Sequence, residues 1–245
     1  STPEAAAAAE IAIRDESWHR AAGNSGTLRA AVFGINDGLV SNLALIMGFA
    51  GAATGNEVIV LAGVAGLLAG AFSMAAGEYI SMQSQRELFE RQIELEREEL
   101  RFMPEREREE LAALYRTKGL SEEEAEMVSK RLMQDPEAAL DTKIREELGL
   151  DPDELGSSWG AAGSSFAAFA VGAIIPLVPF LLTSGVAAIA VSATLALIAL
   201  FIVGALVSLL TGRSLLYSGL RQCFIGGGTA LVTFIVGSVL GVAVA

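Results

Sequence analysis

The sequence has almost no cysteine or histidine, and each shortage excludes a kind of site. Cys223 is the only cysteine among 245 residues, so the chain can form neither an internal disulfide nor a cluster of thiol metal ligands. His19 is the only histidine. Ferritin-type di-iron oxidases hold their metals with Glu-x-x-His pairs in a helical bundle, so a redox centre of that kind is not expected here.

Phosphate-binding motifs are missing as well. The sequence contains neither a Walker motif nor a dinucleotide-binding fingerprint. ATP-driven pumping by this chain therefore has no support. We predict that the protein is not an enzyme and that it does not bind nucleic acid.

Charge is missing from long parts of the chain. Hydrophobic residues make up 52% of the sequence, and apolar stretches lie at about 30–53, 58–77, 161–182, 185–210 and 223–245. The last three contain no charged residue. Each stretch is about long enough to cross the roughly 30 Å hydrocarbon layer of a bilayer as a helix. The sequence therefore predicts an all-α membrane protein with five transmembrane helices.

The basic residues predict how these helices are oriented. Three arginines precede the first span, twelve Arg or Lys lie at 86–145, and Arg213 and Arg221 lie between the last two spans, which accounts for all 17. By the positive-inside rule, residues 1–29 and 81–160 are cytoplasmic and the C-terminus is on the far side. We thus predict a cytoplasmic N-terminal segment at 1–29, two spans at 30–80, a cytoplasmic helical domain inserted at 81–160, and three spans at 161–245.

Asp37 lies early in the first apolar stretch, where an unpaired carboxylate costs several kcal/mol. No basic residue occupies any predicted span, so a water-filled path or a bound cation is its natural partner. Met74 and Glu78 are four residues apart on one face of the second span, near its cytoplasmic end. Taken alone, Met74 could fill a gap in a core and Glu78 could reach the membrane interface.

The segment 81–158 is rich in carboxylates, with 22 Asp or Glu against 12 Lys or Arg. We expect the second span to continue into it as one helix that ends before Pro104, which suits the first turn of the next helix. Ser121 followed by Glu124 predicts a capping box that begins a third helix. Asp135 and Pro136 begin a fourth, which ends near Gly149.

A helical wheel separates these glutamates into two groups. One group shares a polar face with Arg91, and solvent exposure explains it: Glu87, Glu90, Glu94 and Glu98. The other group shares faces with leucine and isoleucine: Glu96, Glu99, Glu107, Glu110 and Glu147.

Carboxylates buried among apolar residues must be protonated, paired with arginine, or bound to a cation. The i, i+3 spacing of Glu96 with Glu99, and of Glu107 with Glu110, lets each pair converge on one ion. A set of oxygen ligands suits Mg²⁺, Ca²⁺, Mn²⁺ or Fe²⁺. Periodicity alone leaves a metal site and a salt-bridged interface equally open.

Four stretches together resemble the vacuolar iron transporter family in its prokaryotic form: NDGLVSNLALIMGFAGA, AGAFSMAAGEYISMQSQRE, the insert that ends in REELGLDPDELGS, and TGRSLLYSGLRQ. The similarity runs from about residue 18 to the end. It implies a five-span homodimer in the prokaryotic inner membrane that moves Fe²⁺, and also Mn²⁺, out of the cytosol in exchange for protons, for iron homeostasis and detoxification.

The resemblance also implies roles for particular residues. Asp37 and Met74 match an aspartate and a methionine that line the family's metal path near the dimer interface. The five glutamates on the apolar faces match those that bind metal in the cytoplasmic domain. Two methionines that plant members carry are Lys143 and Ile144 here. Without these soft ligands, we expect the site to discriminate less sharply between iron and manganese.

We therefore predict a transporter in which the cytoplasmic domain captures the ion, and Asp37, Met74 and Glu78 pass it through the membrane. Asp37 or Glu78 could also carry the exchanged proton. A membrane-anchored metal buffer or sensor that transports nothing is the alternative, although a buffer has no need of Asp37 inside a span. A scaffold whose acidic domain docks a basic partner is a third possibility.

Overall fold

The structure, a computed structural model, describes residues 25–149 and 156–244, and within these residues it contains helices and no strand. Residues 1–24 of the predicted N-terminal segment, His19 among them, and residues 150–155 lie outside the described part. The helices are α2 (Ser25–Gly51), α3 (Asn56–Phe102), α4 (Pro104–Thr117), α5 (Glu122–Leu132), α6 (Pro136–Glu146), α7 (Ser158–Leu182), α8 (Gly185–Thr211) and α9 (Leu215–Val244).

The chain forms two compact units. The first combines residues up to Ile80 with those from Ser158 onward, and the second comprises Ser81–Ser157. Helix α3 runs without a break from the first unit into the second, as the sequence predicts.

Among the described residues, five helices are long and apolar enough to cross a membrane, namely α2, α3, α7, α8 and α9. Their number equals the number of spans that the sequence predicts. Helix α9 begins at Leu215, well before the apolar stretch at 223, because helical hydrogen bonding does not require apolar side chains. Arg221 therefore lies within α9, where its guanidinium carbon is 6.0 Å from the centroid of the Tyr217 ring.

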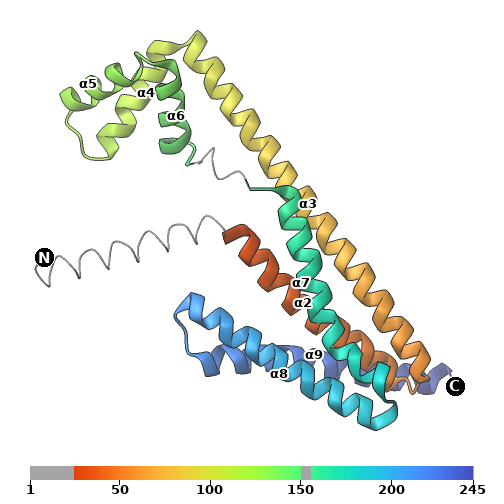
Figure 1. Cartoon of the computed structure of the whole chain (residues 1–245). Coiled ribbons are helices and arrows are strands. Elements are labelled where there is room, and N and C mark those ends of the chain that lie inside the picture. The colour runs from red at the N-terminus through yellow and green to blue at the C-terminus, as the bar shows by residue number, and fades with distance from the viewer. Residues whose placement is uncertain (1–24, 150–155, 245) are drawn as a thin grey trace, which may run out of the picture. The chain divides into compact units, whose positions relative to one another are not determined.

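Helix α2 packs against α7, α8 and α9 in the first unit (Figure 1). Glycine makes the approach to α7 possible from both sides. A Cβ on Gly38 would collide with the backbone carbonyl of Phe169, and one on Gly172 would collide with that of Ile35. Small residues of this kind allow two backbones in a membrane to come into direct contact.

The main apolar cluster of this unit draws residues from all five helices: Leu43, Ile46, Met47, Ile59, Leu177, Phe180, Ala188, Ala196 and Ala230. In a bilayer the lipid tails are as apolar as leucine, so removal from water contributes little between these helices. Close van der Waals packing stabilises the cluster instead.

The membrane-spanning part of α3 is packed much less than α2. Only 17% of its apolar window is buried, and Leu61 and Phe72 are 70% and 63% exposed. Its contacts with α7 include two aromatic pairs, Phe72 with Phe166 and Tyr79 with Trp159, whose ring centroids are 5.1 and 4.8 Å apart. The remaining face is free to contact lipid or a second protein chain.

The second unit contains the end of α3 together with α4, α5 and α6. Its helix ends follow the local signals in the sequence. Pro104 is the first residue of α4. Ser121 and Glu124 form the predicted capping box of α5, and the carboxylate of Asp135 accepts hydrogen bonds from two backbone N–H groups at the start of α6. Helix α6 ends at Glu146, earlier than expected, and Glu147 is its C-terminal cap.

Candidate metal centre and membrane cavity

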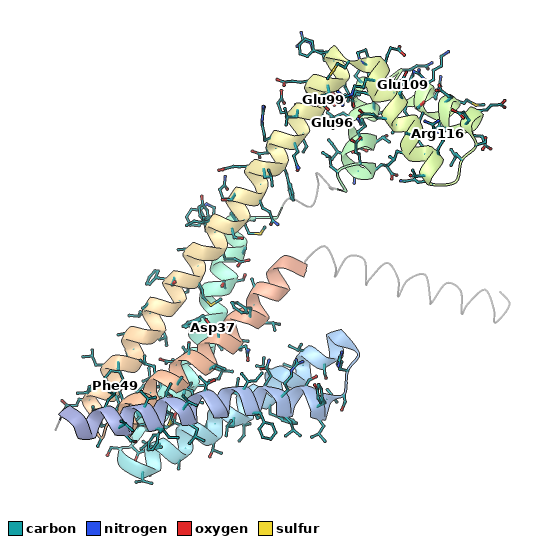
Figure 2. All side chains as sticks on the ribbon, turned by 180° about the vertical axis from the view of Figure 1, so that it is seen from behind. Asp37, Phe49, Glu96, Glu99, Glu109 and Arg116 are labelled. Atoms are coloured by element: carbon teal, nitrogen blue, oxygen red, sulfur yellow. The ribbon has the colours of Figure 1, made fainter. Side chains whose placement is uncertain are left out.

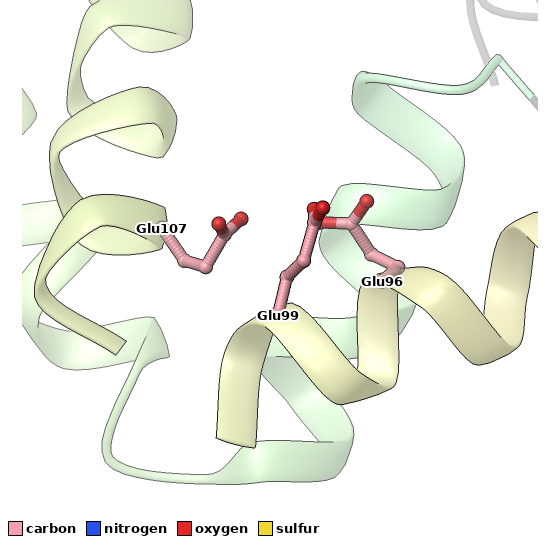
Figure 3. Close-up of side chains that lie close together, drawn as sticks. All are labelled: Glu96, Glu99 and Glu107. Carbon is pink, nitrogen blue, oxygen red and sulfur yellow. The ribbon is translucent and has the colours of Figure 1, made fainter. Parts of the chain in front are cut away.

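Carboxylates from two helices converge in the second unit. Glu96 and Glu99 project from α3, and Glu107 projects toward them from α4 (Figure 3). One oxygen of each lies within 4.8 Å of the other two. The side chain of Glu107 is completely buried, and Glu96 is only 5% exposed. The two sequence signals responsible are the i, i+3 spacing on α3 and the break before Pro104, which lets α4 begin a new direction.

Lys143 of α6 lies in the middle of these carboxylates. Its Nζ atom is 2.6 Å from Glu96 Oε1, 3.0 Å from Glu147 Oε2 and 3.5 Å from Glu110 Oε2, and it also donates a hydrogen bond to Glu107 Oε2. Its side chain is completely buried. Four of the five predicted ligand residues thus share one ammonium group, and Glu99 joins them through its proximity to Glu96 and Glu107.

The electrostatics of the cluster follow from burial and charge. Burial opposes the charge on Lys143, but its hydrogen bonds to the surrounding carboxylates outweigh this cost and raise the pKa of the ammonium. For Glu96 the balance is different. Burial raises the pKa of its carboxyl, and the nearby positive charge of Lys143 only partly offsets the rise.

One lysine does not satisfy the cluster. Glu107 Oε1 is buried and has no hydrogen-bond partner, although the other oxygen of the same carboxylate contacts Lys143. A buried, unpaired carboxylate oxygen is costly, and a cation is the partner that would remove this cost. Oxygen donors of this kind suit hard divalent ions.

The rim of the cluster is exposed and salt-bridged. Glu110 is shared between Lys143 and Arg106, whose Nε lies 2.9 Å from Glu110 Oε1. On α3, Glu90 and Glu94 form surface pairs with Arg86 and Arg97. Glu90 and Glu94 are members of the group on the polar face of α3. Each of these exposed pairs contributes little stability.

Lys143 is not among the cluster residues that the sequence predicts, where it only occupies the position of a methionine of plant members. The signal that would have placed it in the cluster was present, because Leu140, Lys143, Ile144 and Glu147 follow the i, i+3, i+4, i+7 pattern of one helix face. Leu140 and Ile144 are buried together with Lys143. The spacing thus places Lys143 beside Glu147 on one face of α6, whereas its other carboxylate partners come from α3 and α4.

The first unit, hereafter the membrane unit, contains a cavity beside Asp37 of α2, which Figure 2 labels. The cavity has a volume of about 290 Å³. Its lining consists of Asp37, Ser41, Asn42, Leu45, Gly66, Gly70 and Phe169, so α2, α3 and α7 all contribute. Gly66 and Gly70 leave the space that the neighbouring side chains Leu45 and Phe169 partly fill.

Asn42 is a polar residue of this cavity that the predicted set of site residues did not include. It is 2% exposed, and its Nδ2 donates a hydrogen bond of 2.6 Å to the backbone oxygen of Ala173. Its Oδ1 is buried without a partner and lies where a Cβ on Gly66 would be 3.0 Å away. Asp37 and Asn42 thus place a carboxylate and an unpaired amide oxygen on one cavity wall.

The other two predicted path residues lie apart from this cavity lining. Met74 packs against a small cluster formed by Ala71, Phe169 and Ala173. Phe169 belongs both to this cluster and to the cavity lining. Glu78 is partly exposed, one helical turn further along α3. The described chain places Asp37 and Asn42 in the lining of one cavity, whereas Met74 and Glu78 are not part of that lining.

Comparison with known proteins decides the family. A sequence model of the VIT family matches residues 28–238. The chain belongs to the VIT family. The match includes the second unit and all or nearly all of each of the five long apolar helices, so this VIT-family protein is an integral membrane protein.

Similar curated proteins are matched over most of their length. Vacuolar iron transporter 1 of Arabidopsis thaliana is 32% identical over 214 residues, which is 87% of this chain and 86% of that protein. Vacuolar iron transporter of Acanthamoeba castellanii is 34% identical over 231 residues, 92% and 83% of the two chains. Vacuolar iron transporter 2 of Oryza sativa subsp. japonica is 31% identical over 208 residues, 84% and 85%.

Proposed function

We propose that this VIT-family protein transports divalent metal ions, with Fe²⁺ as its main substrate and Mn²⁺ as a second one. The names of its relatives support iron as the cargo. The observation that carries the proposal is the membrane cavity, in which the carboxylate of Asp37 and the unpaired Oδ1 of Asn42 face a space of about 290 Å³. Polar groups inside a membrane are expensive, and they usually mark an ion path.

The second unit would act as the capture site on the cytoplasmic side. Its acidic cluster would draw ions from the cytosol, and Asp37, with Met74 and Glu78, would then pass them through the membrane. The distribution of basic residues supports a cytoplasmic position for this unit, since twelve of the 17 Arg and Lys residues lie in 86–145. Transport would therefore run out of the cytosol, across the inner membrane of a prokaryotic cell.

Proton antiport is the proposed driving force. The described spans have no Asp or Glu in their apolar interior other than Asp37, and Glu78 lies near the end of the span on α3. When it is not bound to a metal, a carboxylate in an apolar setting can carry a proton. Asp37 is therefore the group we assign to alternating metal and proton binding.

A homodimer is the proposed assembly, because the apolar face of α3 is largely uncovered in a single chain. Its mass in detergent micelles, measured by light scattering with the detergent subtracted, would test this assignment. A monomeric mass would contradict it without affecting the proposed cargo.

Flux into proteoliposomes tests the proposed function. Fe²⁺ under anaerobic conditions, and Mn²⁺ separately, are followed with an internal metal-sensitive dye under an imposed pH gradient. We expect flux that depends on the gradient and that Asp37→Ala abolishes. If the wild type and Asp37→Ala both bind metal but neither shows flux, the result would instead support a membrane-anchored buffer. The second unit is a separate compact unit, which is compatible with that function.

A further inference from the structure

We propose that Lys143 is a tethered cation that holds the carboxylate cluster of the second unit together, and that a divalent metal must displace it in order to bind there. This inference deepens the proposed function and rests on it. It assigns a role in metal capture to a residue that carries the same sign of charge as the cargo.

The position of Lys143 is the first argument. Its Nζ contacts oxygens from three helices, with Glu96 on α3, Glu107 on α4 and Glu147 at the end of α6. A divalent ion binds carboxylate oxygens at about 2.0–2.6 Å. An ion drawn to these oxygens would therefore come within a few ångströms of Nζ. Two cations that close repel each other strongly in a protein interior, so the ammonium and the metal exclude one another.

The charge balance is the second argument. Four carboxylates contact one ammonium, the carboxylate of Glu99 lies close to two of them, and Glu107 Oε1 is buried without any partner. Lysine thus compensates the cluster only in part. A divalent ion supplies twice the charge and can accept several oxygens at once. Exchange of lysine for metal is therefore favourable once the metal is concentrated enough, and Lys143 sets the concentration at which that happens.

The burial of Lys143 is the third argument. Its side chain has no exposed surface in the cluster, and an ammonium that a metal displaces is best stabilised by water. Displacement must therefore move Lys143 outward, along with the short helix α6 that carries it. Binding beside an unmoved lysine would leave its amine as inaccessible as before. The accessibility of this one amine distinguishes the two possibilities.

The first experiment titrates the full chain in detergent micelles with Mn²⁺ and measures free Mn²⁺ by its EPR spectrum. Mn²⁺ binding sites that are present in the wild type and absent in Glu107→Gln are assigned to the carboxylate cluster. We expect Lys143→Met to bind Mn²⁺ at these sites about tenfold more tightly than the wild type, or better. The matched control is Lys118→Met. It removes the same charge from the same unit, but the partner of Lys118 is Glu146, outside the cluster.

The second experiment uses the wild-type protein, so it does not depend on a variant that folds. An amine-acylating reagent is applied with chelator and then with saturating Mn²⁺, and each lysine is quantified by mass spectrometry. We expect Lys143 to be protected in chelator and to become several-fold more reactive with Mn²⁺. Lys130 on α5, which is exposed, should react equally in both conditions. If Lys143→Met does not fold, the Mn²⁺ titration of the first experiment uses Lys143→Gln instead, which keeps a polar side chain but removes the charge.

Each outcome separates this inference from the proposed function. Unchanged affinity in Lys143→Met, with Lys143 still protected under Mn²⁺, would overturn the displacement and leave metal capture intact. Absence of any Mn²⁺ binding that depends on Glu107, in wild type and variants alike, would overturn both the displacement and the capture step. Flux through the membrane unit would still be judged by the proteoliposome experiment.

Discussion

Lys143 on α6 and Glu107 on α4 form an ion pair in which neither side chain is accessible to solvent. Removing two charges from water is costly, so a buried pair is weak evidence of stability by itself. Breaking one is a different matter, because it leaves an uncompensated charge in the interior. The cluster is therefore sensitive to single substitutions, and its members can be tested one at a time.

Glu107→Gln tests the centre of the cluster. The substitution keeps the shape of the side chain but removes the charge that Lys143 contacts. We expect a loss of stability of about 1.5–3 kcal/mol, typical of a hydrogen bond to a charged group, together with loss of Mn²⁺ binding at the cluster. Thermal unfolding in chelator and a Mn²⁺ titration measure the two effects.

The control for that variant is Glu109→Gln on the same helix. Glu109, labelled in Figure 2, is exposed. It makes none of the contacts of Lys143. Its substitution should change neither property. Equal effects of the two variants would mean that the overall acidity of the unit matters and that the particular cluster does not.

Asp37→Asn tests the separation between capture and transport. Asparagine preserves the size of the side chain but removes the charge and the exchangeable proton. We expect flux in proteoliposomes to fall to background while Mn²⁺ binding that depends on Glu107 stays unchanged, because the two residues belong to different units. Glu57→Gln, at the exposed start of α3, is the matched control. Loss of both activities in Asp37→Asn would refute separate roles.

The role of Asn42 can be tested with two substitutions, of which one should weaken metal binding in the cavity and the other should retain it. Asn42→Ala removes the unpaired Oδ1 from the cavity wall, so we expect flux at low metal concentration to fall about tenfold, which corresponds to about 1.4 kcal/mol of lost interaction. Asn42→Asp retains an oxygen at that place and adds charge, so it should retain metal binding. A fall of equal size in both variants would assign Asn42 to packing through its hydrogen bond with Ala173.

Gly38→Ala tests the contact between α2 and α7. The new Cβ would collide with the backbone at Phe169, which cannot rotate away as a side chain can. We expect a loss of about 1–3 kcal/mol, seen as a lower unfolding temperature in micelles. Gly77→Ala on α3 meets no atom within 4 Å and should be neutral or stabilising, since alanine favours the helix. If Gly38→Ala unfolded at the wild-type temperature, the close backbone contact would be wrong.

Much of the local structure was readable from the sequence. The apolar stretches predicted five spans because a helix that crosses a bilayer must be long and nearly free of charge. Pro104, the Ser121–Glu124 capping box and the Asp135–Pro136 pair predicted where helices of the second unit begin, because capping is decided by residues a few positions apart. The i, i+3 and i, i+4 spacings also placed five glutamates on apolar faces.

Only the tertiary structure decided what those glutamates meet. Helical periodicity says which side chains share a face, but it does not say which other helix covers that face. Lys143 reaches Glu96 and Glu107 because α6 packs near α3 and α4, across separations of 47 and 36 residues in the chain. In the same way, Asn42 lines the cavity beside Asp37 because two glycines of α3 and the ring of Phe169 on α7 pack around it. Charge and burial along one helix are properties of its sequence, whereas the partner of a buried charge depends on how separate helices pack.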